Sequence, residues 1–299
     1  MRLPGPNPSS CAGRALPARP PANTLGRMPT RAMTSAEISL PGTAEPVKVR
    51  ERIALLADTV DIVGLTDNHA GQARMSPLAA VALAREQGVR TIVHVSCRDR
   101  NRLALRSQVI GAAALGSEGV LCVQGDPAGD APPVRDVKAS ELIGAVREWA
   151  APRPLEPGAV VNPFATDLDR ELRLLEKKVA GGASFVQSQM TFDIDALARF
   201  LERAAGILAG VRFYASVALL RNSAMLDRAE RLPGVSIPEG AAREIVAGRG
   251  VALAGRLAAE LATLDGVDAL HVFPLGAERE TPAVAGAFRA AKGMPAQRR

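Results

Sequence analysis

The chain has 299 residues, of which 47% are hydrophobic and 23% charged, and its formal net charge is +6. That apolar fraction can bury a large core, so the chain as a whole is not of the disordered class, and no run of about 18 uncharged apolar residues suggests a membrane span. Three scattered cysteines, Cys11, Cys97 and Cys122, predict neither a disulfide framework nor a zinc site, and a cytoplasmic protein is expected.

The excess positive charge lies at the start of the chain. Residues 1–36 hold five Arg, no Lys and no acid, and the rest has 32 basic against 31 acidic residues, so no nucleic-acid partner is expected. Residues 1–33 contain seven Pro and no apolar periodicity, which predicts a disordered Pro/Arg-rich extension. An organelle transit peptide has similar composition, but the Pro content favours a plain extension, with Met28 or Met33 opening the folded part.

From residue 34 onward, apolar runs of strand length alternate with helical patterns. The runs lie at 36–40, 60–65, 91–95, 119–123, 159–164, 184–187, 211–217 and 269–273. Apolar residues recur at three- and four-residue spacing over 77–87, 103–115, 140–149, 168–180, 194–208 and 241–264. Eight strands with intervening helices predict an α/β fold, a (β/α)8 TIM-type barrel, for residues 34–299. A doubly wound open sheet is the alternative, but the first strand lacks a G-x-G-x-x-G turn.

Polar residues gather where the predicted strands end, which is where a barrel of this type carries its chemistry. They are Glu37, 66–68, His94, 96–99, 124–126, Asn162, Gln187, Gln189, His271, Glu278 and Arg279. Core packing is a poor explanation for so many, because a buried polar group without a partner costs about 1–3 kcal/mol. We leave His69 and His271 as structural, since neither has an evident partner in the sequence.

Three of these positions suggest particular chemistry. Glu37 interrupts an apolar strand, and burial in a barrel mouth should raise the pKa of its carboxyl, as suits a general acid. Asp126 follows a Gly turn and is either a site carboxylate or a helix cap. Gln189 can donate and accept at once, which suits the edge of a flat heterocycle, or it satisfies loop backbone. The Arg-rich run 98–102 could hold phosphate or carboxylate groups, or form a salt-bridged turn.

Taken together, these segments resemble the methylenetetrahydrofolate reductase family over roughly residues 35–285. The resemblance is carried by AEIS at 36–39, GLTDN at 64–68, HVSCRDRNR at 94–102, VQGDP at 123–127, NPF at 162–164, KVAGGA at 178–183 leading to QSQ at 187–189, and LPGVSIP at 232–238.

The resemblance implies a barrel that holds FAD at its C-terminal rim and uses NAD(P)H as co-substrate. Hydride would then reduce 5,10-methylenetetrahydrofolate to 5-methyltetrahydrofolate, a step of one-carbon metabolism. Glu37 matches the family's general acid, Asp126 the aspartate beside flavin and pterin, and Gln189 the residue that reads the pterin. The matching flavin-contact positions are Thr66, His94, Gln124, Gly125, Asp126 and Lys178. Homo-oligomers are common in the family, no metal is implied, and no membrane partner is expected.

The sequence also departs from the family pattern. Gln124 stands where an Arg is often found, Lys138 where a Tyr covers the flavin, and Ala277 where an Arg follows the last strand. A flavin-free relative that takes hydride directly from the nicotinamide is therefore an alternative. So are a non-catalytic folate- or partner-binding subunit and a folate-linked methyltransferase.

Overall fold

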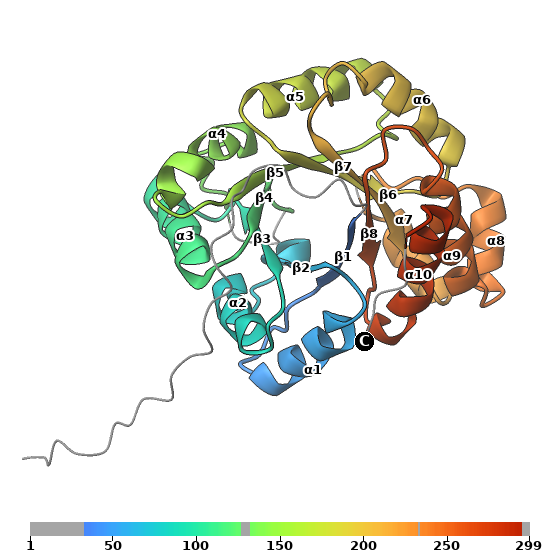
Figure 1. Cartoon of the computed structure of the whole chain (residues 1–299), viewed down its shortest axis with the longest axis horizontal. Coiled ribbons are helices and arrows are strands. Elements are labelled where there is room, and N and C mark those ends of the chain that lie inside the picture. Colours follow the sequence, from blue (N-terminus) through green and yellow to red (C-terminus); the bar gives the residue numbers. More distant parts are fainter. Residues whose placement is uncertain (1–32, 127–131, 233, 295–299) are drawn as a thin grey trace, which may run out of the picture. The chain divides into compact units, whose positions relative to one another are not determined.

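A computed structural model describes residues 33–126, 132–232 and 234–294, which lie within one compact unit. Eight parallel strands close into a barrel in chain order, and helices surround it (Figure 1). The predicted (β/α)8 barrel is therefore confirmed. The predicted extension lies outside the described residues except for Met33, which begins the first strand.

The strands and helices have the following bounds. The strands are β1 (Met33–Ile38), β2 (Ile62–Leu65), β3 (Thr91–Ser96), β4 (Gly119–Val123), β5 (Glu156–Val161), β6 (Phe185–Met190), β7 (Arg212–Ala218) and β8 (Ala269–Phe273). The helices are α1 (Pro46–Ala57), α2 (Pro77–Glu86), α3 (Arg102–Leu115), α4 (Ala139–Ala150), α5 (Leu168–Ala180), α6 (Ile194–Ala204), α7 (Ser223–Glu230), α8 (Glu239–Val246), α9 (Gly250–Leu261) and α10 (Thr281–Ala291), with 3-10 turns η1 (His69–Gly71) and η2 (Glu278–Glu280).

Two element boundaries differ from the sequence prediction. The first strand runs from Met33 to Ile38 instead of over 36–40, because its early residues pair with β8. The helix predicted over 241–264 is two helices, α8 and α9. Gly248 has a φ of +75° between them, and a side chain on Gly250 would begin 1.7 Å from the Leu220 carbonyl oxygen. The chain therefore turns here and packs its backbone against the residues that follow β7.

The seam of the barrel joins the first strand to the last. β1 pairs with β2 and β8, and the register sets Ser35 beside His271 and Glu37 beside Gly64. Near the start of the seam, buried Arg289 of α10 forms an ion pair with Asp61 at 3.0 Å and also bonds Thr34. Residues from both ends of the barrel sequence thus become neighbours.

One side of the barrel interior is packed by an aromatic ring. Gly158 of β5 faces Phe185 of β6 so closely that a Cβ at position 158 would lie 2.0 Å from the ring, and a Cβ on Gly119 would lie 3.2 Å from it. Phe185 also makes an edge-to-face contact with Tyr214, with ring centroids 5.9 Å apart. Glycine on β4 and β5 therefore makes room for one large side chain from β6.

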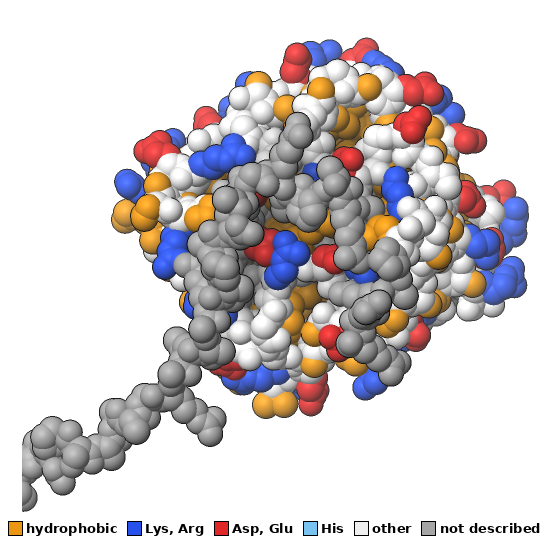
Figure 2. All heavy atoms as spheres, in the orientation of Figure 1, with side chains coloured by type: hydrophobic (Ala, Val, Ile, Leu, Met, Phe, Trp, Pro, Cys, Tyr) orange, Lys and Arg blue, Asp and Glu red, His pale blue; other side chains and the backbone are white. Residues whose placement is uncertain are grey.

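The surface carries both signs of charge. On the face seen in Figure 2, acidic and basic side chains are interspersed around the rim. Ion pairs also join neighbouring helices, such as Arg50 of α1 with Glu86 of α2 at 2.7 Å. Among the described residues, no helix combines the length and the hydropathy needed to cross a bilayer.

Candidate active site

Glu37 lies in the mouth of the barrel. Side chains alternate along a strand, and Ala36 and Ile38 are fully buried against the helical layer, so Glu37 points to the interior. Its side chain is 12% exposed. The neighbouring position on β2 is Gly64, where a Cβ would lie 3.3 Å from both the Glu37 Cβ and the His94 Nε2. The missing side chain at 64 lets a carboxyl and an imidazole from β1 and β3 lie on either side of the same backbone.

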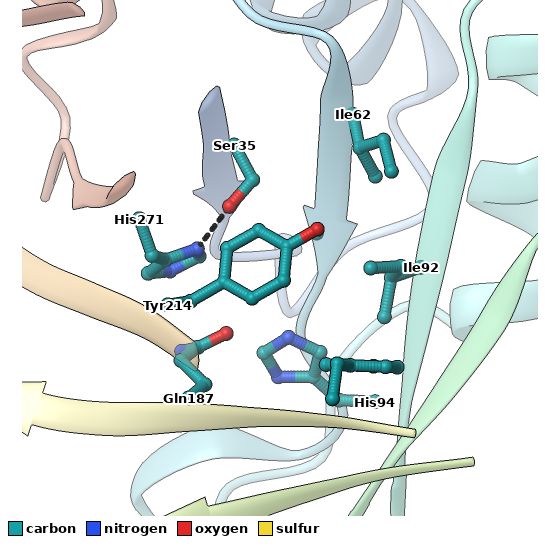
Figure 3. Close-up of a pocket in the computed structure, with 9 residues that line it drawn as sticks. Ser35, Ile62, Ile92, His94, Gln187, Tyr214 and His271 are labelled. Atoms are coloured by element: carbon teal, nitrogen blue, oxygen red, sulfur yellow. Dashed lines mark hydrogen bonds between the residues drawn. The ribbon is translucent and has the colours of Figure 1, made fainter. Parts of the chain in front are cut away.

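His271 connects Glu37 to Ser35. Its Nδ1 lies 2.9 Å from the Ser35 hydroxyl oxygen, and its Nε2 lies 3.6 Å from the Glu37 Oε2 (Figure 3 shows the Ser35 contact). The ring is almost completely buried, with its edge against Phe273. Because both ring nitrogens face polar side chains from β1, the imidazole can donate a proton toward Glu37 while Ser35 supports its other nitrogen.

The expected rise in the Glu37 pKa is wrong. Burial does act to raise the pKa of this carboxyl, but the close contact with His271 and the charges of His94, His271 and His69 act to lower it. The net pKa lies below the ordinary value of a glutamate. Loss of water alone would raise this pKa, but the fold also brings three histidines to Glu37. These three are all the histidines in the chain.

Asp126 lies after β4, and its carboxylate organises the loop that follows β2. Its Oδ2 accepts the Ala70 N–H at 2.7 Å. Ala70 has a φ of +56° and Asn68 a φ of +45°, so two non-glycine residues adopt the left-handed region on either side of His69. Such backbone conformations concentrate at functional sites. Gly125 has a φ of +91°, and a Cβ there would lie 2.0 Å from the Ser96 hydroxyl oxygen, so this turn requires glycine.

Three further predicted residues already hold backbone partners. The Thr66 hydroxyl donates to the Ile38 carbonyl at 3.2 Å. The Lys178 ammonium donates to the Val160 carbonyl at 2.7 Å, and burial lowers its pKa. Gln189 accepts the N–H of the next residue through its Oε1 at 2.9 Å. These contacts fix the three side chains near the strand ends.

The Arg-rich run after β3 is a salt-bridged turn. Arg100 forms an ion pair with Asp67, whose carboxylate also accepts the Ser96 N–H at 2.8 Å, and Arg98 forms an ion pair with Asp99. The two cysteines that lie within the described residues, Cys97 and Cys122, are buried and free, and burial raises the pKa of the Cys97 thiol to about 12. Within residues 33–126, 132–232 and 234–294, no three His, Cys, Asp or Glu side chains are grouped as metal ligands.

The main residue that the sequence reasoning missed is His271. The sequence could have indicated it, because an inward-facing residue on the eighth strand lies next to the first strand when the barrel closes. His69 was also left as structural, yet its ring interacts electrostatically with both Glu37 and Asp126, and burial lowers its pKa. The site is thus built from β1, β3 and β8 and the loops after β2 and β4.

Comparison with known proteins identifies the family and the fold. A family model described as methylenetetrahydrofolate reductase matches residues 26–287. The chain belongs to this family. It is also similar in structure to an uncharacterized protein from Clostridium thermocellum that binds two copies of 5-methyl-5,6,7,8-tetrahydrofolic acid. The two are 14% identical with a TM-score of 0.67, and the match covers 88% of this chain and 96% of that one.

Other barrels are similar at lower scores. A tryptophan synthase structure from Mycobacterium tuberculosis is 16% identical with a TM-score of 0.53, covering 90% of this chain and 94% of that one. A Yersinia pestis DHPS with a pterine-sulfa conjugate is 13% identical with a TM-score of 0.50, covering 88% and 94%. At these identities the likeness concerns the fold alone.

Proposed function

We propose that this member of the family reduces 5,10-methylenetetrahydrofolate to 5-methyltetrahydrofolate with hydride from NADH or NADPH. The observation that carries the proposal is the buried carboxyl of Glu37 in the barrel mouth, with the His271 Nε2 3.6 Å from its Oε2. The family match supports the substrate class. The ligand bound by the Clostridium thermocellum neighbour is the product expected of this reaction.

The reaction needs an acid as well as a hydride donor. The five-membered ring of the substrate must open to an N5 iminium before hydride can add, and opening requires a proton on the departing N10. Glu37 delivers that proton in this proposal. Its lowered pKa favours the carboxylate before substrate binds, and the His271 Nε2, 3.6 Å from the Glu37 Oε2, is positioned to return a proton to it. A substrate that covers the mouth removes water from the carboxylate, which favours the protonated form at the moment of reaction.

Asp126 and Gln189 orient the pterin in this proposal. The Asp126 carboxylate lies at the end of β4 and is fixed by the Ala70 N–H, so its negative charge is available to stabilise the iminium cation. The Gln189 Oε1 accepts a backbone N–H, which fixes the side-chain amide that reads the pterin in this proposal. Both groups are therefore supported before substrate binds, as an electrostatic role requires.

Several polar groups at the strand ends have donors that fit the polar edge of a flavin ring. Gln124 uses its Oε1 to accept the Ala139 N–H at 3.3 Å, so its amide donors remain, and the Lys178 ammonium has more hydrogens than its bond to Val160 uses. Gly125 permits close approach of the backbone. When FAD is bound there, it supplies a hydride acceptor and donor between nicotinamide and folate. Thr66, His94, Gln124, Gly125, Asp126 and Lys178 would hold it.

A flavin-free reductase is the second candidate, and specific residues favour it. Lys138 caps α4 where the resemblance predicts an aromatic side chain, and its N–H donates to Glu141. Arg100, which could have held a cofactor phosphate, is committed to Asp67. In this version the nicotinamide transfers hydride directly to the iminium, and the roles of Glu37 and Asp126 do not change.

The test is folate-dependent oxidation of NADH and NADPH by the purified protein, with an absorbance spectrum taken first. A protein with bound flavin shows the absorbance bands of oxidised flavin. If the protein lacks these bands but still oxidises the nicotinamide in the presence of folate, the flavin-free reductase is the correct candidate. Glu37→Gln should lower folate reduction by about 10²–10⁴-fold. Nicotinamide-dependent flavin reduction should persist in that variant. Glu202→Gln, which changes an exposed glutamate on α6, is the control.

Three results would contradict the proposal. Near wild-type folate turnover in Glu37→Gln would exclude this residue as the acid. Folate binding without any nicotinamide oxidation would point to a non-catalytic folate-binding protein. Methyl transfer to a thiol or cobalamin acceptor without nicotinamide would identify a methyltransferase.

A further inference from the structure

A small pocket lies in the barrel interior around the residues that support Glu37. It is lined by Ser35, Ile62, Gly64, Ile92, His94, Phe185, Gln187, Tyr214 and His271. Figure 3 shows the Gln187 amide and the His94 ring near each other, with the Tyr214 ring beside them. Polar side chains from β1, β3, β6, β7 and β8 thus meet around one space.

Two of these polar side chains are buried without a hydrogen-bonding partner. His94 and Gln187 are each 8% exposed. Within the described ranges, the Gln187 amide and the His94 ring nitrogens make no hydrogen bond, whereas Ser35 and His271 bond each other. Tyr214 differs from both because its hydroxyl has Arg212 and the Met33 sulfur as partners. The Nε2 of His271, which lines the same pocket, is buried and has no hydrogen-bonding partner among the described residues. A buried polar group without a partner costs about 1–3 kcal/mol, so the polar side chains around this space favour a polar occupant.

The size of the pocket limits that occupant to something very small. The space between the lining side chains accepts about one water-sized molecule, which is the least that a buried water needs. Buried waters make about three hydrogen bonds on average. The amide of Gln187 offers both a donor and an acceptor, and a neutral His94 offers one of each.

We propose that this pocket binds one ordered water, held by the Gln187 amide, and that this water orients the His94 ring toward Glu37. Gln187 is then a positioning residue, because it acts through the water and His94 and does not itself touch substrate. The functional part of this proposal rests on Glu37 being the acid of the proposed reaction. The water site itself does not depend on any reaction.

The connection from the pocket to Glu37 passes over Gly64. The His94 Nε2 and the Glu37 Cβ lie on either side of Gly64, each 3.3 Å from where its Cβ would be. The titratable groups that interact with His94 are Glu37, His271, Asp67 and His69. Burial is the main cause of the lowered His94 pKa. A water bonded to the ring offsets part of that burial, so its removal should lower the His94 pKa further.

The first experiment is a high-resolution crystal structure of the full-length protein. We expect one ordered water within hydrogen-bonding distance of both the Gln187 amide and the His94 ring. A dry pocket, or a direct bond between these two side chains, would overturn the water site. This measurement needs no variant and no activity.

The second experiment is an NMR titration of the three histidines in the wild type and in Gln187→Met, which retains length but removes the amide. The His94 pKa should fall by at least about half a unit in the variant, because the desolvated ring loses its polar partner. Ile92→Leu changes an apolar wall of the same pocket and is the matched control. An unchanged His94 pKa in Gln187→Met, or an equal change in both variants, would overturn the positioning role.

If folate reduction is found, its pH profile gives an independent readout. A His94 ring that is harder to protonate presents less positive charge to Glu37, so the Glu37 pKa should rise and the limb of the profile that reports it should move to higher pH in Gln187→Met. An unmoved limb would contradict the link to Glu37. If folate reduction is not found, the crystal structure and the titration still decide the water site, so failure of the two proposals can be told apart.

Discussion

The two sides of the barrel interior are built in opposite ways. On the β4–β6 side, Phe185 fills the space left by Gly119 and Gly158, and the contacts are those of a packed core. On the side formed by β8, β1, β2 and β3, Glu37 and His94 lie on either side of Gly64, and His271 contacts Glu37 from β8. Glycine is needed on both sides. Gly119 and Gly158 leave space for the Phe185 ring, whereas Gly64 leaves space for the Glu37 and His94 side chains. One side is therefore filled by apolar packing, and the other is lined by ionisable side chains.

The largest effect on stability is expected from the buried ion pair between Arg100 and Asp67. Arg100→Met leaves the Asp67 carboxylate buried without its cation, and we expect the free energy of unfolding to fall by about 3–5 kcal/mol. Urea denaturation measures the loss. Arg106→Met, at an exposed position on α3, is the control and should change little. A loss below about 1 kcal/mol for Arg100→Met would mean that this pair is no stronger than a surface ion pair.

On the packed side, Gly158→Ala should destabilise the fold by about 1–3 kcal/mol, because the new methyl group would overlap the Phe185 ring. Adding Phe185→Leu should restore part of that loss. Gly255→Ala on α9 adds a methyl group in open space and serves as control. If Gly158→Ala and Gly255→Ala were equally stable, the ring would not be as tightly held as its contacts indicate.

The polar side should also make stability depend on pH. The folded-state pKa of His94 lies below its ordinary value of 6.5, so the unfolded chain takes up a proton first as the pH falls. Stability is therefore complete above about pH 6.5 and decreases below it, by at most about 1.4 kcal/mol per pH unit for one group. The lowered pKa of Glu37 acts in the same direction below its ordinary value of 4.5. Denaturation curves at pH 7.5, 6 and 5 should show a shallower dependence in His94→Gln.

The smallest effect on stability is expected from Gly64→Ala. Its Cβ would lie 3.3 Å from Glu37 and His94, so these side chains need to move by only a few tenths of an ångström, and the stability cost should stay below about 1 kcal/mol. Folate turnover should nevertheless fall roughly tenfold or more, because the acid is displaced. If Gly64→Ala and Gly158→Ala changed the free energy of unfolding equally and also changed folate turnover equally, the two sides of the barrel would not differ in the way that their contacts indicate.

The barrel was predictable because each strand is short, apolar and followed by a helical pattern. The break between α8 and α9 was not, since it depends on Gly250 contacting the Leu220 carbonyl, a contact that no local pattern records. Glu37 was found as a charge in an apolar strand, but the direction of its pKa was wrong because that depends on three histidines from three other segments. His271 needed the closure of β8 onto β1 before its partners could be seen. The assigned roles of Glu37, Asp126 and Gln189 stay predictions.

The seam between β1 and β8 has a consequence for synthesis on the ribosome. Glu37 emerges early in translation, but its neighbour His271 belongs to the last strand of the sheet. A nascent chain that stops before β8 therefore has the carboxyl without the imidazole that faces it. In the reaction proposed above, proton transfer at Glu37 therefore requires that β8 has joined the barrel.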